Sequence, residues 1–262
     1  MEPVNNFPDD KKSSITYLLT DIDDTITNNG RIPALAFKAL EDLDKAGIKV
    51  IPVTGRPAGW CDHIARMWPV KGVVGENGAF YFTYDMYAKK MIQRYYKTDQ
   101  QRLQDKKKLA AIEQKILQQV SGCVVSADQS YREADLAIDF AEDVPTLSQS
   151  DIDKIVDIFE QDGATAKISS IHVNGWFGNY DKLSMTKIMF KEVFKTDLDV
   201  IKKNVIFAGD SPNDEPMFEY FPNSVGVANV LAFKGTLKSK PAWITEDEGG
   251  FGFAQLVEML LS

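Results

Sequence analysis

Short apolar runs and amphipathic stretches alternate along the first eighty residues. The apolar, β-branched runs at 15–22, 48–53 and 72–75 are typical of buried parallel strands. Between them, residues 33–47 carry one apolar stripe that starts at a proline and ends at a glycine, and residues 58–68 also look helical. This order of strand and helix predicts a parallel sheet with helices on its faces.

The pattern changes after about residue 82. Residues 80–96 are rich in aromatic side chains, and their polar and apolar positions roughly alternate, which predicts antiparallel strands. Here we expect a separate α/β lobe with an antiparallel sheet. Its expected helices are 100–120 and 150–162, and its expected strands are 123–126, 134–140, 164–169 and 171–176.

The parallel pattern then resumes, with helices expected at 183–195, 215–221 and 251–261 and strands at 204–208, 224–227 and, as the last edge strand, 242–245. The predicted fold class is therefore α/β: a Rossmann-like doubly wound parallel sheet core with an inserted α/β cap domain. The expected division is a flexible N-terminal tail at 1–14, the core at 15–83 and 179–262, and the cap at 84–178.

Composition and charge narrow the possible partners. The 262 residues are 44% hydrophobic and 26% charged, as in ordinary globular proteins. A formal net charge of −8 repels phosphate backbones, which argues against nucleic acid. Cys61 and Cys123 form no metal-binding or disulfide pattern. With a polar N-terminus and no apolar run of about 20 residues, we expect a cytoplasmic protein without a membrane partner. The oligomeric state is not predicted.

Three polar loops, at 21–25, 54–57 and 209–214, each follow a predicted strand. Ligands of open parallel sheets bind at the carboxyl ends of the strands, so we expect these loops to converge. Asp21, Asp23, Asp210 and Asp214 would then concentrate negative charge that requires a counter-ion. With only oxygen ligands on offer, Mg²⁺ is favoured over zinc.

A magnesium-bound acid cluster of this kind suits phosphoryl transfer. Asp21, at the end of a strand, is the expected nucleophile, and Asp23 would protonate the leaving oxygen and then activate water. Thr25 and Thr54 would hydrogen-bond the phosphoryl group. Lys182 is the candidate for a balancing positive charge, with Lys187 as the alternative. Any one of the acidic loops could also be only a turn or a helix cap. Their occurrence together favours chemistry.

These loops resemble the motifs of the haloacid dehalogenase superfamily. Residues 21–25 (DIDDT) resemble the first motif DxDxT, residues 53–56 the second, Lys182 the third and residues 209–214 (GDSPND) the fourth. The sequence Glu76-Asn77-Gly78-Ala79 and the position of the lobe are similar to subclass IIB, which includes sucrose-phosphate, trehalose-phosphate and mannosyl-phosphoglycerate phosphatases. The family lysine is commonly followed by glycine, whereas Leu183 follows Lys182 here.

The resemblance implies a role for each matching residue. Asp21 would be nucleophile and metal ligand, and Asp23 would be acid/base and a ligand through its carbonyl group. Asp210 would be a further ligand, and Asp214 would support the metal. The residues expected to hold phosphate are Thr25, Thr54, Gly55, Arg56, Lys182 and Asn213.

The cap is expected to exclude water and to select the substrate. Candidate contacts are Glu76, Asn77, Arg132, His172, Asn174 and Trp176. A lone histidine in a strand is more often structural, and a tryptophan more often packs than stacks on a sugar, so these two residues have a competing interpretation.

The expected function is a magnesium-dependent phosphomonoester hydrolase that acts on a small phosphorylated metabolite such as a sugar phosphate. A phosphosugar mutase would use the same aspartyl phosphate but return the phosphoryl group to a sugar hydroxyl. A receiver-type signalling module also groups acids, a threonine and a lysine around magnesium, but such modules lack a large insertion. A non-catalytic phosphate-binding protein is the remaining alternative.

Overall fold

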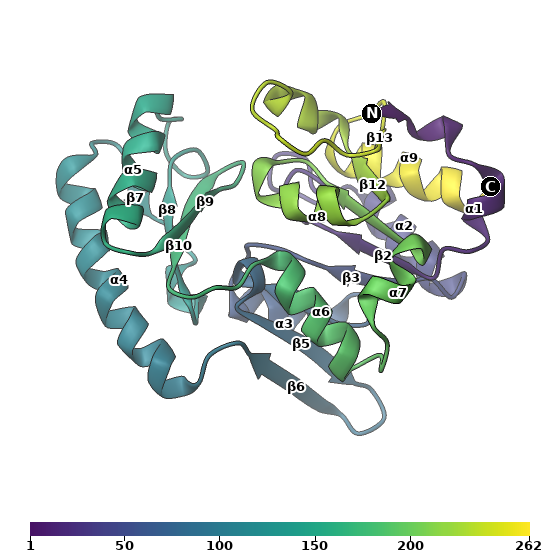
Figure 1. Ribbon diagram of the computed structural model, residues 1–262, viewed down its shortest axis with the longest axis horizontal. Helices are drawn as coiled ribbons and strands as arrows, with labels where there is room; N and C mark the ends of the chain where they lie inside the picture. The colour runs from purple at the N-terminus through teal and green to yellow at the C-terminus, as the bar shows by residue number, and fades with distance from the viewer.

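The computed structural model describes residues 1–262 and divides into two lobes (Figure 1). The larger lobe contains both chain termini and the parallel sheet. The smaller lobe, which we call the cap, is connected to the larger one by two crossings of the chain. The predicted fold class, a parallel α/β core with an inserted α/β cap, is confirmed.

The core sheet has six strands, and every neighbouring pair is parallel. Their order is β1 (Glu2–Pro3), β13 (Trp243–Ile244), β12 (Asn223–Gly226), β11 (Val205–Gly209), β2 (Tyr17–Thr20) and β3 (Lys49–Pro52). The strands β2 and β11 are adjacent and fully buried. Their carboxyl ends therefore lie side by side at one edge of the sheet.

Helices cover both faces of this sheet because its strands are apolar on both sides. Leu18 and Ile206 share a hydrophobic cluster with α2 (Ala34–Lys45) and α9 (Gly249–Leu261). Leu19 and Phe207, one residue further along each strand, pack with α6 (Lys182–Glu192) and α8 (Glu215–Tyr220) on the opposite face. This alternation fixes the doubly wound arrangement. The short helices α1 (Asp9–Lys12) and α7 (Leu198–Ile201) lie outside the sheet.

The hairpin of β5 (Phe80–Asp85) and β6 (Lys90–Tyr95) belongs with the core rather than with the cap. Strand β5 pairs with β4 (Val73–Gly75), which in turn meets the parallel sheet through a Val53–Val74 bridge. Helix α3 (Ala58–Met67) packs against the same hairpin. The expected cap boundary at residue 84 would divide this hairpin. That expectation came from the antiparallel pattern of the segment, and antiparallel pairing alone does not mark a new domain. We propose that the cap begins after β6.

The cap consists of an antiparallel sheet covered on one face by two helices. The strand order is β7 (Val124–Val125), β8 (Asp135–Asp139), β10 (His172–Trp176) and β9 (Thr165–Ile168). The helices are α4 (Asp99–Gln119) and α5 (Gln149–Gln161). Leu136, Ile138 and Val173 pack with these helices. The intervening residues of β10, including His172 and Asn174, therefore lie on the other face of the sheet.

The N-terminal residues are ordered against the core, so the expectation of a flexible tail was wrong. Glu2 and Pro3 pair with β13, which makes β1 rather than β13 the edge strand. Val4 and Phe7 are buried, and the Phe7 ring packs edge-on against Trp243 with centroids 5.2 Å apart. Two apolar side chains within a polar segment are enough to hold it on an unfilled sheet edge.

Replacing Phe7 with alanine is expected to lower the free energy of unfolding by about 3 kcal/mol, because it empties a buried aromatic site. Urea unfolding would measure the change, with the exposed Val200→Ala as the control. An unchanged unfolding midpoint in Phe7→Ala would show that the segment contributes nothing to the core.

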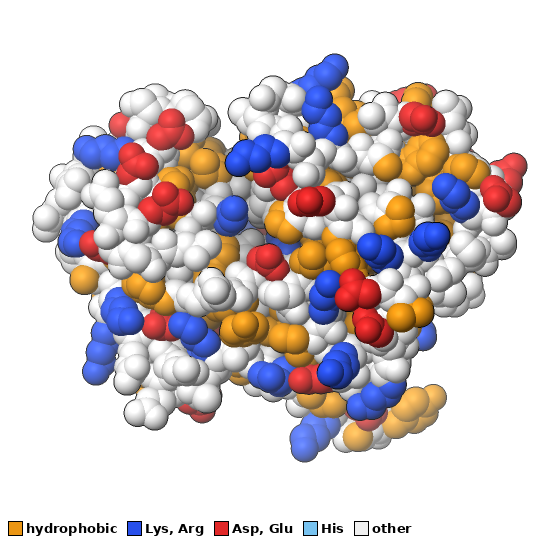
Figure 2. Space-filling view, in the orientation of Figure 1, with side chains coloured by type: hydrophobic (Ala, Val, Ile, Leu, Met, Phe, Trp, Pro, Cys, Tyr) orange, Lys and Arg blue, Asp and Glu red, His pale blue; other side chains and the backbone are white.

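Charged side chains of both signs are mixed over the visible surface of the two lobes. Figure 2 shows Lys and Arg side chains interspersed with Asp and Glu on this face. None of the helices has the length and apolar character needed to cross a bilayer.

Candidate active site

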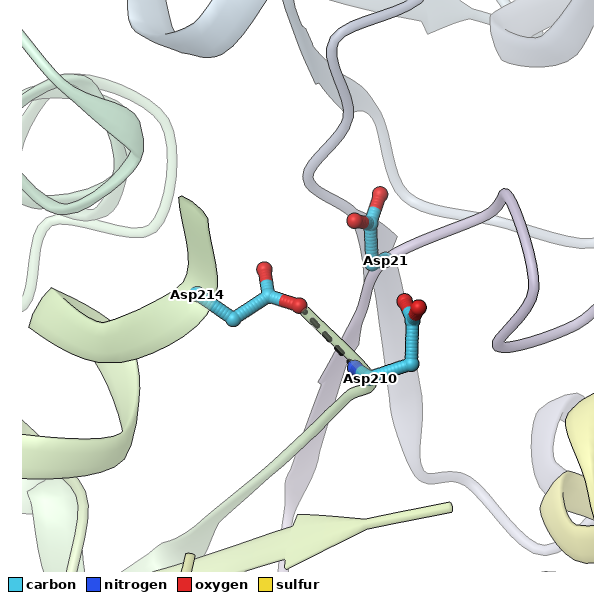
Figure 3. Close-up of side chains that lie close together, drawn as sticks. All are labelled: Asp21, Asp210 and Asp214. Carbon is cyan, nitrogen blue, oxygen red and sulfur yellow. Dashed lines mark hydrogen bonds between the residues drawn. The ribbon is translucent and has the colours of Figure 1, made fainter. Parts of the chain in front are cut away.

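Three aspartates from two separate parts of the chain meet at the carboxyl edge of the core sheet (Figure 3). Asp21 directly follows β2, and Asp210 directly follows the neighbouring strand β11. Asp214 ends a single 3₁₀ turn at Pro212–Asp214, and its carboxylate accepts a hydrogen bond from the backbone N–H of Asp210 at 3.0 Å. Carboxylate oxygens of the three residues lie within 4.8 Å of one another.

Burial makes this cluster electrostatically unfavourable without a cation. The pKa of Asp21 is raised to about 7, chiefly by burial and in part by the neighbouring Asp214 and Asp23, while the Lys182 ammonium opposes the shift. Burial and the neighbouring Asp214 and Asp21 also raise the pKa of Asp210 well above its ordinary value. Three carboxylates and one ammonium leave an excess of negative charge. Such an all-oxygen donor set fits a hard dication such as Mg²⁺.

Lys182 provides the cationic side chain of the cluster. Its Nζ lies 2.7 Å from Asp21 Oδ2, 2.7 Å from Asp214 Oδ1 and 3.3 Å from Asn213 Oδ1. It is only 2% exposed at the start of α6, where the Asp181 side chain caps the helix. Lys187, the alternative weighed from the sequence, lies on the surface and pairs with Asp199. The structure thus brings Lys182, and not Lys187, to the aspartates.

Glycine at position 78 allows the start of α6 to approach this site. Its φ is +106°, and an added Cβ would lie 2.0 Å from the carbonyl oxygen of Asp181. A side chain at this position would therefore displace the residue immediately before Lys182.

Arg56 links the loop that contains Asp23 to the cap. Its guanidinium donates to the Asp23 carboxylate at 2.8 to 3.0 Å and to Glu142 at 2.8 Å, and it lies 3.5 Å from Asp128. The last two acids belong to the cap. The imidazole of His172 and the Arg56 guanidinium lower the pKa of Glu142 to about 2. Arg56 therefore forms ion pairs with Asp23 of the core and with Glu142 of the cap, and so connects the two lobes.

A small polar pocket lies between these loops and the cap. From the core it is lined by Asp21, Asp23, Gly55, Arg56, Ser211 and Asn213, and from the cap by Arg132, Ser169, Ser170, Ile171, His172 and Asn174. The two expected acid residues and three of the expected phosphate-binding residues thus share one pocket with three expected cap contacts.

Thr25 and Thr54 lie behind the pocket rather than in it. Thr25 is fully buried, and its hydroxyl donates to Asp210 at 2.9 Å. Thr54 is also fully buried, and its hydroxyl accepts the backbone N–H of Arg56 at 3.1 Å. The Thr25 hydroxyl thus positions a carboxylate in this structure, and its contact with phosphate stays a prediction.

Three of the expected substrate residues lie outside the pocket. The Glu76 carboxylate is fully buried and accepts hydrogen bonds from the backbone N–H groups of Ala58, Glu133, Ala134 and Asp135. Asn77 packs against Gly55 with a φ of +53°. Trp176 is buried and stacks on Tyr180 with centroids 5.7 Å apart. Glu76 binds backbone groups of the cap, and Asn77 and Trp176 pack against other residues of the protein. The polarity of these residues and their positions in the sequence could not reveal these contacts.

The remaining cap residues are held by partners of their own. Arg132 donates to Asp128, to Asp135 and to the carbonyl oxygen of Gly55. Asn174 donates to Asp135 at 3.0 Å, and His172 Nε2 lies 2.9 Å from Glu142. Their side chains border the pocket in fixed orientations.

Sequence reasoning missed several pocket residues. Ser169, Ser170 and Ile171 form the turn between β9 and β10, which lies over the GDSPND loop. A polar turn between two predicted cap strands was the only available signal. Ser211 belongs to the GDSPND motif, but the motif gave no sign that it borders the pocket. Its hydroxyl donates to Asn213 Oδ1 at 2.8 Å.

Comparisons with known proteins agree with this geometry. Residues 18–143 match the family model of haloacid dehalogenase-like hydrolases. No curated protein sequence matches the chain significantly.

Similar solved structures cover nearly the whole chain. A protein of Thermoplasma acidophilum is 18% identical, with a TM-score of 0.70, over 94% of this chain and 98% of its own. The sucrose-phosphatase of Synechocystis sp. PCC6803 is 15% identical, with a TM-score of 0.63, over 93% and 97%. A sugar phosphatase of haloacid dehalogenase subclass IIB is 16% identical, with a TM-score of 0.59, over 88% and 93%. At these identities, the structures establish a shared fold.

The family match includes the loop that carries Asp21 and the loop that carries Arg56. The shared fold extends over the cap and the second half of the core. Together, the family match over residues 18–143, the shared fold and the converging motifs make the chain similar to haloacid dehalogenase-like hydrolases.

Proposed function

We propose that the chain is a magnesium-dependent phosphomonoester hydrolase that acts through an aspartyl phosphate on Asp21. The observation that carries this proposal is the buried cluster of Asp21, Asp210, Asp214 and Lys182 at the carboxyl edge of the sheet. It combines a positioned nucleophile with charged groups that suit a phosphoryl group.

Asp21, Asp210 and Asp214, with the backbone carbonyl of Asp23, would hold the metal. When bound, Mg²⁺ would neutralise charge on the aspartates and on the phosphoryl oxygens. Lys182 adds a fixed positive charge that touches both Asp21 and Asp214.

The protein side chains would then perform two displacements. A carboxylate oxygen of Asp21 bonds to phosphorus as the bond to the leaving oxygen breaks, and Asp23 gives that oxygen a proton. In the second step Asp23 takes a proton from water, whose oxygen bonds to phosphorus while the bond to Asp21 breaks. Arg56 supports this assignment because it holds Asp23 in the same pocket as Asp21.

Gly55, Arg56, Lys182 and Asn213 are the proposed phosphate-binding residues. Gly55 and Asn213 border the pocket directly, and Asn213 accepts from both Lys182 and Ser211. The pocket measures only about 10 Å³, so we expect the lobes to separate when substrate enters.

The proposed substrate is a small phosphorylated metabolite, with sugar phosphates first. The names of two structural neighbours, a sucrose-phosphatase and a sugar phosphatase, support this class. Arg132, His172 and Asn174 are the polar cap side chains that could recognise it. Phosphate release from sugar phosphates, phosphoglycerates and nucleotides, each with and without Mg²⁺, tests the proposal. Release from none of them would overturn it.

Metal-free protein is expected to lose stability as the pH rises from about 4 to about 7. The folded pKa of Asp21 is raised from 3.8 to about 7, so the folded state binds more protons than the unfolded state in this window. Stabilisation is therefore present at low pH and lost as Asp21 ionises. Saturating Mg²⁺ should remove this loss.

Urea unfolding across this window, with and without Mg²⁺, would measure the effect. Asp21→Asn is the control, because it cannot ionise at this position and should show a smaller pH-dependent difference. Equal stability of the metal-free and Mg²⁺-containing wild type at pH 7 would contradict a metal site in this cluster.

A further inference from the structure

A second cavity, of about 550 Å³, lies beside the polar pocket on the core, where one cap residue, Tyr131, also borders it. Its walls include Trp60 and Ile64 from α3, Ile22 and Ile32 from the loop after β2, and Tyr131 from the cap. A volume of this size is typical of small-molecule sites. None of these five side chains has a role in the mechanism above.

Asp23 connects this cavity to the reaction site. It borders both the second cavity and the polar pocket that contains Asp21. A residue that protonates the leaving oxygen must lie within hydrogen-bond reach of that oxygen. The leaving oxygen must therefore lie next to Asp23, and the group attached to this oxygen can extend into the second cavity, which Asp23 also borders.

The walls of the cavity are mainly apolar and include three aromatic side chains, Trp60, Trp68 and Tyr131, beside the polar Asp23, Thr27 and His63. Trp60 is 42% exposed and Tyr131 is 57% exposed, so their surfaces remain accessible. The Arg56 guanidinium lies 4.4 Å from the centre of the Trp60 ring and thereby ties this ring to the Asp23 ion pair. Large accessible aromatic surfaces beside a reaction site favour a flat apolar ligand.

Gly59 brings the cap onto this part of α3. A Cβ at this position would lie 3.0 Å from the Cβ of Tyr131 and 3.1 to 3.2 Å from its ring atoms. The absence of a side chain at residue 59 thus lets Tyr131 close one side of the cavity. The cap would complete the cavity walls as the lobes come together.

We propose that this cavity is a leaving-group subsite that binds a planar, largely apolar ring. The inference rests on the proposed phosphohydrolase function and extends its substrates to phosphomonoesters of ring-bearing alcohols. Apart from Asp23, Thr27 and His63, these walls offer few partners to a chain with many hydroxyl groups. A separate cavity of about 340 Å³, which Asp23 also borders together with Asn29, Arg56 and Glu142, offers more polar partners to such a chain.

Benzyl phosphate and ethyl phosphate provide a matched test, because both carry the phosphate on a CH₂ group and differ mainly in the ring. Wild-type kcat/KM should favour the benzyl ester by about tenfold. Trp60→Ala and Tyr131→Ala should each lower the benzyl-to-ethyl ratio by roughly fivefold, whereas Trp60→Phe, which keeps a flat ring, should retain most of it. Tyr87→Ala is the control, because Tyr87 is fully exposed and borders neither cavity.

The outcomes separate the two proposals. A wild-type ratio near one, or a ratio unchanged in both alanine variants, would overturn the subsite and leave the hydrolase proposal standing. If no phosphate ester is hydrolysed at all, the hydrolase proposal fails. Calorimetric binding of benzyl phosphonate against ethyl phosphonate then decides the subsite, with tighter benzyl binding that weakens in Trp60→Ala expected and equal binding contradicting it.

Discussion

Replacing Asp21 with asparagine is expected to lower phosphate release by about 10⁴-fold or more, because the amide cannot serve as the nucleophile. The fold should persist, since the asparagine side chain has nearly the same shape as that of aspartate. Metal-free Asp21→Asn should be at least as stable as the wild type above pH 7, because one ionised carboxylate is removed from a buried acidic cluster. Steady-state phosphate release and urea unfolding would measure both effects.

Asp24→Asn is the matched control for this variant. Asp24 lies in the same loop but does not border the small polar pocket, and its φ of +53° is one that asparagine tolerates. We expect its phosphate release to stay within a few-fold of the wild type. Similar large losses in Asp21→Asn and Asp24→Asn would mean that the loop, rather than one nucleophile, had been disturbed.

Replacing Lys182 with methionine is expected to have the second largest effect. The ammonium contacts two buried carboxylates at 2.7 Å, so its removal leaves both without their cationic partner. The free energy of unfolding should fall by about 3 to 5 kcal/mol in the metal-free protein at neutral pH. Phosphate release should fall by about 10²-fold or more, since the charge beside Asp21 is lost.

Lys187→Met separates this effect from general loss of charge on α6. Lys187 forms an exposed pair with Asp199, and such pairs contribute about 1 kcal/mol or less. This variant should therefore remain close to the wild type in stability and activity. If Lys182→Met behaved like Lys187→Met, the lysine assignment would have to be withdrawn.

The sequence predicted the core of the fold because its strands are apolar on both sides and its helices carry one apolar stripe. The polar residues that follow β2 and β11 interrupt those patterns, and the known geometry of parallel sheets brings them together. The fold class and the convergence of Asp21 and Asp210 could therefore be deduced before the structure was known. Neither deduction required the detailed contacts of any side chain.

What the sequence could not supply depends on contacts between distant segments. In the sequence, Phe7 is an apolar residue in a polar segment, and nothing indicates that its ring contacts Trp243, which lies far away along the chain. Glu76 reads as a candidate substrate contact, but four backbone N–H groups from α3 and the cap occupy its carboxylate. Charge and polarity alone do not tell whether a side chain faces a ligand or its own protein.

The bridge formed by Arg56 shows the same limitation. The motif indicated that Arg56 lies near the reaction site, but it gave no sign of Glu142, which lies in an unremarkable acidic segment of the cap. Similarly, the aromatic cavity combines α3 with a cap turn more than sixty residues away. Such pairings follow from how the cap is placed on the core.

If Asp21 carries the phosphoryl group during turnover, chemical trapping should find the modification at this residue. Protein mixed with substrate and Mg²⁺ would be acid-quenched and treated with borohydride, which reduces an aspartyl phosphate to homoserine. Peptide mass spectrometry should then find homoserine at position 21, dependent on substrate and absent when Mg²⁺ is withheld. Efficient phosphate release with homoserine at another aspartate, and none at position 21, would show that Asp21 is not the nucleophile.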